Sequence, residues 1–313
     1  MSEATENVVQ VSGGNSRSCL TAGKSALNDT EHPSYFNAAR LDNGNIVSVD
    51  MVRVRLQLMG DGGEWLSEHL QLVNCDDMTC WTSKIRPGGW YELWNFSFGD
   101  SSVSVGIGFM NGSCKVDMHR AFVEFNPNKL GSDQRFVKLL DFMKPHVAHA
   151  DVKRFDLAMD VPRPRNDLRV TKDGRMYAAY VSNGLTEYLG RRNSDGFVKV
   201  YDKSAESDLS VPLTRIELTA SGEWSPAEVC KHWPQVHGWH ADSPSRDWTR
   251  VVGILLSEKV ERGEEVESLI SMLGRGSRPK VREYLRSALV ELPVDAAEYC
   301  VRESRAWCER LSR

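Results

Sequence analysis

The chain has 313 residues, of which 41% are hydrophobic and 26% charged, and its formal net charge at pH 7 is -4. These values are ordinary for a globular protein of one or two domains. No stretch approaches the roughly 20 apolar residues of a transmembrane helix, and the first residues lack the basic and apolar regions of a signal peptide. The acidic balance argues against a protein that coats nucleic acid nonspecifically, and the seven cysteines, an odd number, are typical of reduced thiols. We therefore expect a cytoplasmic protein without membrane contact.

The first part of the chain predicts a flexible arm followed by a mixed fold. Residues 1–34 are rich in Ser, Asn, Thr, Gly and Glu, which is typical of a weakly ordered segment. Hydrophobic patterns then predict a strand over 52–58, a helix over 65–73, strands over 90–98 and 114–125, and a helix over 133–143. This order predicts an α+β fold with an antiparallel sheet core and packed helices, in which two strand-then-helix series form related halves.

Two later strands carry acidic residues on one face. In the segment 154–160, side chains alternate so that Asp156 and Asp160 share a face opposite three apolar residues. The segment 214–220 repeats this pattern, with Glu217 on its polar face. Sheets with one wet face commonly alternate in the same way, so either strand alone is equally typical of a solvated surface.

The segment 188–203 is typical of a strand, a polar turn and a second strand that ends in Tyr201, Asp202 and Lys203. Tyr201 lies on the polar face of that second strand. If the polar strands pair in one antiparallel sheet, this phenol and the carboxylates converge on one face. Carboxylate oxygens suit Mg²⁺ or Mn²⁺, a bound metal polarises a phosphate, and a Tyr hydroxyl can act as a nucleophile. The pattern therefore predicts metal-dependent phosphoryl transfer.

The run YLGRRNSDGFVKVYDK, with RFDLAMD before it and TRIEL after it, resembles the Rep_trans family of rolling-circle replication initiators. The resemblance covers roughly residues 110 to 225. It implies an enzyme that nicks one DNA strand at an origin through a hairpin tyrosine, becomes linked to the 5′ phosphate and leaves a 3′ hydroxyl as primer. Tyr201 matches that tyrosine and Asp202 the acid that follows it. Lys199 stands where the family often has Arg, which keeps the charge but loses the planar guanidinium.

The resemblance also implies the roles of the neighbouring residues. Tyr201 is the expected nucleophile, and Lys203 with Arg191 is expected to steady phosphates. Two or three of four acids are expected to hold Mg²⁺ or Mn²⁺, namely Asp156, Asp160, Asp202 and Glu217. The triplet of His, apolar residue and His that binds metal in many other rolling-circle nickases does not occur in this sequence, which favours acidic ligands.

The last 70 residues predict helices with a basic turn between two of them. Stripes of apolar residues at helical spacing occur over 248–256 and 281–289, and the turn lies at 274–279. The cations that cluster there are Arg275, Arg278, Lys280 and Arg282. A short basic turn between two helices can form a DNA-binding element, although such pairs also serve as plain packing units or partner surfaces.

These observations predict three regions: a flexible arm over 1–34, an α+β nicking domain over 35–242 and a helical region over 243–313. The predicted function is rolling-circle initiation through a covalent 5′-phosphotyrosine intermediate. DNA is the expected partner, together with a host helicase and a second copy of the chain. A relaxase for conjugative transfer uses the same chemistry, and a noncatalytic DNA-binding regulator is the alternative from another class. The sequence leaves both open, because neither the origin nor the neighbouring genes are encoded in it.

Overall fold

The computed structural model describes residues 21–22, 37–73, 77–81, 89–110, 115–181, 184–238, 259 and 266–312. A 12-stranded antiparallel sheet runs through this described part of the chain. Its main path has the order β10-β11-β12-β13-β8-β3-β7-β6-β5-β4, while β2 (Ala38–Arg40) pairs with β3, and β1 (Thr21–Ala22) pairs with β2. The predicted α+β class with an antiparallel sheet core is therefore confirmed.

The main path consists of two halves with the same strand order. The first half contains β3 (Ile46–Leu58), β4 (Asp77–Trp81), β5 (Trp90–Phe98), β6 (Ser101–Met110) and β7 (Val116–Phe125). The second half contains β8 (Val147–Val161), β10 (Tyr177–Val181), β11 (Leu185–Leu189), β12 (Val198–Asp202) and β13 (Thr214–Ser221). From the centre outwards, the first half has the order β3-β7-β6-β5-β4, and the second half has the order β8-β13-β12-β11-β10. In each half, the first strand in the chain is therefore at the centre and pairs with the last strand. The two halves meet where β3 pairs with β8.

The long central strands β3 and β8 hold the two halves together. They pair from Ile46 opposite Asp160 to Leu58 opposite Val147, and every second residue over much of their length is apolar and buried. The register shifts after Val49, which leaves Asp50 as an extra residue of β3 at a β-bulge. The sequence pattern predicted only the later part of each strand, over 52–58 and 154–160.

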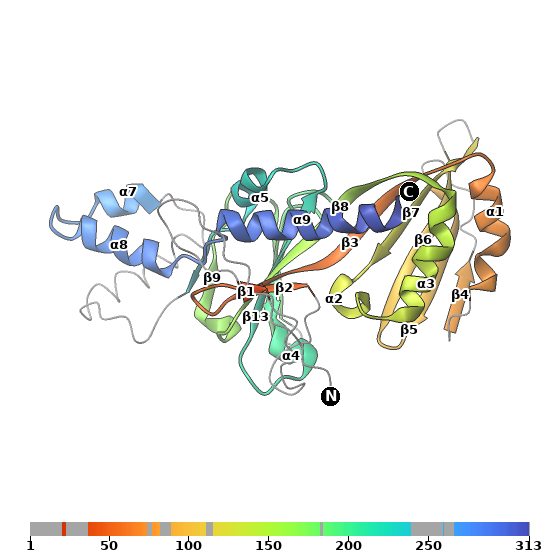
Figure 1. Ribbon diagram of the computed structural model, residues 1–313. Helices are drawn as coiled ribbons and strands as arrows, with labels where there is room; N and C mark the ends of the chain where they lie inside the picture. Colours follow the sequence, from red (N-terminus) through yellow and green to blue (C-terminus); the bar gives the residue numbers. More distant parts are fainter. Residues whose placement is uncertain are drawn as a thin grey trace.

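Helices cover one face of the sheet. The longest, α9 (Val294–Leu311), lies along β8 and β3, with α5 (Pro226–His232) and α3 (Gln134–Met143) beside it (Figure 1). The Trp307 ring of α9 lies 4.9 Å from the Phe125 ring and 5.8 Å from the Phe136 ring, measured between centroids. Phe125 and Phe155 both pair with Val52 and so share its face. This apolar face is the core, and Asp156 therefore projects from the opposite face.

The remaining elements are short. The helices and 3₁₀ turns are α1 (Gly62–His69), η1 (Leu70–Leu72), α2 (Pro127–Leu130), η2 (Lys144–His146), η3 (Arg165–Asp167), α4 (Lys203–Ser207), α7 (Val266–Ser271) and α8 (Arg278–Ala288). A separate two-stranded sheet joins β9 (Leu168–Val170) to β14 (Val236–Gly238). The predicted helix over 133–143 is confirmed, with Asp133 as its N-cap, and that over 65–73 begins earlier and ends as a 3₁₀ turn. In the described part of the chain, no helix is long and apolar enough to span a membrane.

The C-terminal region divides into two parts, unlike the predicted single helical region over 243–313. The pair α7 and α8 stands away from the sheet (Figure 1) and has a small apolar cluster of its own around Ile270 and Val281. In contrast, α9 belongs to the main hydrophobic core. A helical stripe does not reveal which surface it covers, so the sequence could not separate these parts. The helix expected over 248–256 lies outside the described residues, as does the expected arm over 1–34 apart from β1.

Candidate active site

Strand pairing brings the predicted tyrosine and acids onto one face of the second half. Tyr201 of β12 lies opposite Arg215 of β13, which in turn lies opposite Asp160 of β8. Residues directly opposite each other in antiparallel strands share a face, and positions two apart on a strand do as well. Glu217 and Asp156 therefore project from the same face as Tyr201, opposite the helices. The predicted convergence of the phenol and the carboxylates on one face depends on this strand pairing. The alternation of side chains within each strand could not show which strands pair.

The hydroxyl of Tyr201 is held by a carboxylate. Tyr201 is only 5% exposed, and its hydroxyl donates a hydrogen bond of 2.7 Å to Oε1 of Glu217. Burial and the negative charge of Glu217 raise the pKa of Tyr201 well above its ordinary value near 10. The phenol is therefore protonated at neutral pH, and it can attack a phosphorus atom only if a nearby group accepts its proton.

Glu217 is suited to accept that proton. Its side chain is 17% exposed, and burial together with the charge of Asp50 raises its pKa to about 7, against the opposing effects of Lys199 and Arg215. A carboxyl group with such a pKa is ionised in part at neutral pH and still basic enough to take a proton. The Tyr201 and Glu217 pair thus has the geometry of a nucleophile and its general base.

Lysines surround the Tyr201 ring. The Nζ atom of Lys199 lies 3.7 Å from the ring centroid and 4.0 Å from Oε2 of Glu217. Lys203 lies 6.0 Å from the same centroid and forms an ion pair with Glu206. Lys199 and Lys203 are therefore beside the phenol, whereas Arg191 is exposed in the turn before β12. A phosphate approaching Tyr201 would meet Lys199 first, a residue that the sequence singled out only as a departure from the Rep_trans pattern.

Two of the four predicted metal ligands already have strong partners. Arg215 donates from Nε and Nη2 to the two carboxylate oxygens of Asp160, at 2.6 and 2.7 Å, and from Nη1 to Asp50 at 3.1 Å. Asp160 is 2% exposed and Arg215 is 3% exposed. Asp202 caps α4, where it accepts hydrogen bonds from the Ala205 amide and the Ser204 hydroxyl. These engagements assign Asp160 and Asp202 to holding the strands and the helix in place.

The other two predicted ligands have raised carboxyl pKa values, because burial outweighs the effect of their polar neighbours. Burial raises the pKa of Asp156 to about 6; Thr219 and Arg154 lower it, and Asp50 raises it further. Asp50 likewise raises the pKa of Glu217. Among the described residues, no three His, Cys, Asp or Glu side chains are grouped as metal ligands. Asp156 and Glu217 carry the carboxylate oxygens that Mg²⁺ prefers, and proteins often hold this ion by one or two carboxylates while phosphate and water complete the coordination.

The turn between β11 and β12 is fixed against the neighbouring strand. Gly190 and Gly196 have φ angles of 90° and 82°, which glycine adopts without strain. The Gly196 amide donates to the Thr219 carbonyl at 2.8 Å, and Nη1 of Arg175 donates to the Gly196 carbonyl at 2.8 Å. A side chain at position 190 would approach the Gly196 carbonyl to 3.3 Å. The glycines of the hairpin therefore serve its close packing, which positions β12 and Tyr201.

The four predicted DNA-binding cations lie on the α7 and α8 pair, away from Tyr201. Arg282 pairs with Glu267 at 2.7 Å, and Arg278 donates to the Leu273 carbonyl at 2.9 Å. Arg275 and Lys280 are exposed. The structure therefore leaves two of the four cations directed to solvent and gives the other two contacts within the helix pair.

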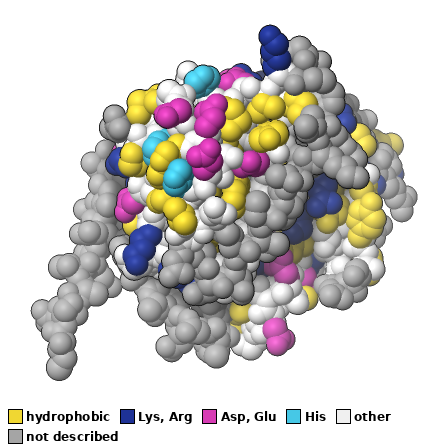
Figure 2. Space-filling model, turned by 90° about the vertical axis from the view of Figure 1, so that its right-hand side faces the viewer, with side chains coloured by type: hydrophobic (Ala, Val, Ile, Leu, Met, Phe, Trp, Pro, Cys, Tyr) yellow, Lys and Arg dark blue, Asp and Glu magenta, His cyan; other side chains and the backbone are white. Residues whose placement is uncertain are grey.

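The opposite end of the molecule has a different character. Acidic and His side chains gather among apolar ones at the end that carries α1 (Figure 2), a helix with Glu64 and Glu68 on it. Acidic side chains repel phosphates. The charge distribution therefore favours an approach of DNA to the second half of the sheet rather than to this end.

A buried tyrosine bound to a glutamate, with lysines and further carboxylates on the same sheet face, defines a candidate site for phosphoryl transfer. No protein-family model matches the chain. Two proteins of Staphylococcus aureus, each named replication initiation protein, are similar to it. One is 27% identical over 186 residues, 55% of this chain and 56% of the relative, and the other is 26% identical over 197 residues, 58% of each. The chain thus matches little more than half the length of these relatives.

A solved structure is also similar, that of a rolling circle replication initiator protein from Geobacillus stearothermophilus. The match covers 78% of this chain and 97% of that one, with 12% sequence identity and a TM-score of 0.36. A score this low does not establish a common fold.

Proposed function

We propose that the chain is a rolling-circle replication initiator that nicks one DNA strand with Tyr201 as the nucleophile. The hydrogen bond between the Tyr201 hydroxyl and Glu217 is the observation that carries this proposal. It couples a nucleophile to a base on a sheet face where lysines can meet a phosphate. The similarity to proteins named replication initiation protein and the resemblance of the hairpin to the Rep_trans family support the same function.

The residues of the site support a direct displacement at phosphorus. The Tyr201 oxygen forms a bond to the scissile phosphorus while its proton passes to Oε1 of Glu217, 2.7 Å away. The bond from phosphorus to the 3′ oxygen breaks, and the leaving 3′ oxygen takes a proton from water. The products are a 5′-phosphotyrosine and a free 3′ hydroxyl. Attack by a 3′ hydroxyl on this intermediate reverses the step, returns the proton to Tyr201 and rejoins the strand.

Lys199 is placed to stabilise charge during this reaction. Its ammonium lies over the Tyr201 ring, where it favours the electron-rich phenolate and can contact a phosphate oxygen. Lys203, whose Nζ atom lies 6.0 Å from the Tyr201 ring centroid, contributes more weakly, because Glu206 neutralises it. Arg191 stays a predicted phosphate contact that only a bound strand can bring into the site.

We further propose that Asp156 and Glu217 hold Mg²⁺ or Mn²⁺. The support is that burial and Asp50 raise both carboxyl pKa values, a state that a nearby cation would relieve. When bound, the ion would polarise the scissile phosphate and stabilise negative charge on its oxygens. Asp160 and Asp202 are the less suitable ligands, because Arg215 binds both oxygens of Asp160 and the α4 N-terminus binds Oδ1 of Asp202.

The experiment is a nicking assay on supercoiled DNA that carries the cognate origin, with Mn²⁺ present and the covalent adduct detected on a denaturing gel. Tyr201→Phe removes the attacking oxygen, so nicking and adduct should fall by about 10⁴-fold or more. Tyr177→Phe is a matched control, because the Tyr177 hydroxyl also donates to a glutamate, Glu187, but from the other face of the sheet. Normal adduct formation by Tyr201→Phe would refute the assignment and direct attention to Tyr188 and Tyr180.

The same assay separates the alternatives. A noncatalytic regulator would bind the origin without forming an adduct. A relaxase would form the adduct, yet the nicked origin would not support replication of a plasmid that carries it. The predicted helicase partner and second copy of the chain can be tested in the same replication reaction, by adding a helicase and by measuring the mass of the complex on DNA.

A further inference from the structure

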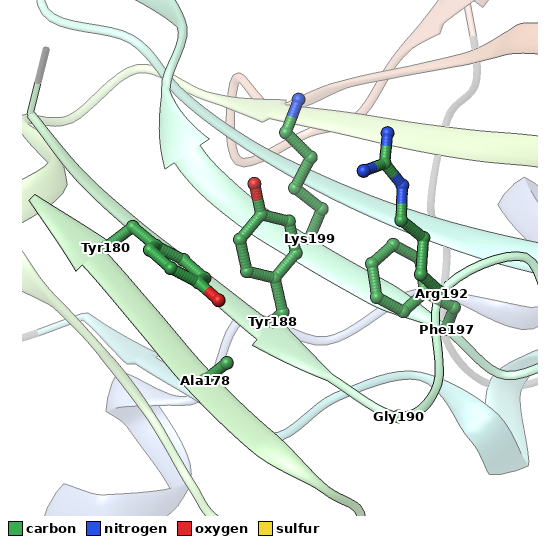
Figure 3. A pocket seen from close by; sticks show the side chains of 7 residues that line it. All are labelled: Ala178, Tyr180, Tyr188, Gly190, Arg192, Phe197 and Lys199. Atoms are coloured by element: carbon green, nitrogen blue, oxygen red, sulfur yellow. The ribbon is translucent and has the colours of Figure 1, made fainter. Parts of the chain in front are cut away.

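A pocket of about 560 Å³ opens on the sheet face beside the Tyr201 site. It is lined by Ala178 and Tyr180 of β10, Tyr188 of β11, Gly190 and Arg192 of the turn, and Phe197 and Lys199 at β12 (Figure 3). Tyr188 pairs with both Lys199 and Ala178, so these residues project from the same face as Tyr201. The pocket is therefore a lateral continuation of the site and not a separate cavity behind the sheet.

Three aromatic rings form the floor and one wall of this pocket. The Tyr188 and Phe197 rings are nearly parallel, with 16° between their planes and 5.7 Å between centroids. Tyr180 meets Tyr188 edge to face at 5.8 Å and is 62% exposed. A flat ring inserted between Tyr188 and Phe197 would need about 7 Å, twice a normal carbon contact. A planar ligand must therefore lie over the exposed faces and edges of the rings.

The charges of the pocket specify the chemistry of such a ligand. Arg192 and Lys199 are its two charged lining residues, and both are cationic. Lys199 also lies over the Tyr201 ring, so one side chain borders both the pocket and the nucleophile. A ligand that combines planar rings with negative charge, and that continues into the site as a phosphate, matches this arrangement.

We propose that this pocket binds unpaired nucleobases of the DNA strand next to the scissile phosphate, with bases on Tyr180 and Tyr188 and backbone phosphates at Arg192 and Lys199. This inference rests on the proposed nicking function and names the form of its substrate. Bases in a duplex are already stacked and cannot present their faces to a protein ring, whereas an extruded single strand can. The site would thus take melted origin DNA, and the aromatic pocket would hold the strand in register with Tyr201.

The test is the affinity for a dye-labelled single strand of about 16 thymidines, measured by fluorescence anisotropy in EDTA so that no cleavage occurs. Tyr180→Ala should weaken binding by roughly tenfold to a hundredfold, because it removes one stacking surface. Tyr188→Leu should act in the same direction while keeping an apolar contact for Phe197. Tyr177→Ala, on the same strand as Tyr180 but on the other face, should bind normally.

Salt dependence adds a second readout that loss of folding would not imitate. Arg192→Ala should lower the slope of log affinity against log salt by about 0.7, because one phosphate contact is lost. Tyr180→Ala should leave that slope unchanged. Equal affinities for wild type, Tyr180→Ala and Tyr188→Leu would overturn the pocket assignment even if nicking occurs. If the aromatic variants lose affinity but no adduct ever forms, the pocket assignment stands and the nicking function is refuted.

Discussion

The two halves of the sheet share one topology, and each has a glutamate on its last strand, but the residues around these two glutamates differ. In the second half, Glu217 of β13 lies opposite Lys199 of β12. In the first half, Glu124 of β7 lies opposite Ser104 of β6. On its other side Glu217 faces Ala158 of β8, whereas Glu124 faces an arginine of β3. Each half therefore presents one glutamate from its last strand, β7 or β13, on the same face of the sheet.

The neighbours of these glutamates explain why only one half contains the candidate site. Glu124 binds Arg53 at 2.6 Å and Arg154 at 3.2 Å. Two residues further along, the pair that corresponds to Tyr201 and Arg215 is Gly106 and Phe122, and the Phe122 ring fills the space beside the glycine. A glutamate neutralised by two guanidinium groups joins strands. A glutamate bound to a phenol can accept its proton.

Exchanging the two glutamates for glutamine would test this comparison most severely. Glu217→Gln should lower the nicking rate by about 10²–10⁴-fold, because an amide can bind the phenol but cannot take its proton. In wild type the rate should rise as the pH passes the pKa of Glu217, which is about 7 in the absence of a metal ion, and a Mn²⁺ ion bound by Glu217 would shift this rise to lower pH. Glu124→Gln should nick at nearly the wild-type rate. Equal losses in both variants, measured by quenched-flow nicking, would show that Glu217 acts only through the fold.

The stability of Glu217→Gln provides an independent check, because this variant should be more stable than wild type although it nicks more slowly. The pKa of Glu217 is raised from 4.5 to about 7 on folding. Between these values the folded protein binds more protons than the unfolded chain, so this group lowers stability progressively as the pH rises through that window. At about pH 8 the variant should gain on the order of 1–3 kcal/mol in free energy of unfolding. Urea titrations that show no gain at this pH would contradict the prediction that folding raises the pKa of Glu217.

Removing Asp156 should separate chemistry from binding. Asp156→Asn should slow nicking in Mn²⁺ by about 10²-fold or more, since the loss of several kcal/mol of metal stabilisation has that effect. Affinity for origin DNA in EDTA should be unchanged or slightly better, because a negative charge near a phosphate is removed. Asp151→Asn is the control on the same strand, where Asp151 binds Arg55 near the surface. Joint loss of binding and nicking would indicate a folding role for Asp156 instead.

The buried Arg215 should matter for folding more than the exposed Arg55. Arg215→Met leaves Asp160 buried without its bidentate partner and should cost about 3–5 kcal/mol of unfolding free energy. Arg55 of β3 also forms an ion pair across the sheet, with Asp151 of β8, but its side chain is 53% exposed, and Arg55→Met should cost at most about 1 kcal/mol. Thermal unfolding of both variants compares them directly. Similar costs would contradict the view that the burial of the Arg215 and Asp160 pair sets its importance for folding.

The weakest expected effect concerns the α7 and α8 pair. Arg275→Ala with Lys280→Ala removes the two exposed cations and should lower the salt slope for origin binding by about one unit for each lost phosphate contact. Arg282→Ala should change it less, because Glu267 already pairs with that guanidinium. Binding measured over a range of salt concentrations decides this. An unchanged slope with an altered oligomeric mass would assign these helices to a protein partner rather than to DNA.

The sequence by itself determined the strands that carry the candidate site, namely β8, β12 and β13, and the kinds of side chain on their faces. Alternation placed Tyr201, Glu217, Asp156 and Asp160 on polar faces, because side chains of a strand alternate whatever its partner is. Helical stripes and a capping residue likewise fixed α3. These features depend on residues close together in the chain, and local geometry decides them.

Tertiary structure alone decided which of these residues meet. Asp50 enters the site only because a bulge in β3 projects it there, and Asp160 is bound by Arg215 only because β13 pairs with β8 in one register. The burial that raises the pKa of Glu217 likewise comes from strands far apart in the sequence. Register, bulges and burial depend on contacts between distant segments, so no local pattern encodes them. They decide that Glu217 can accept a proton whereas Asp160 forms a structural ion pair.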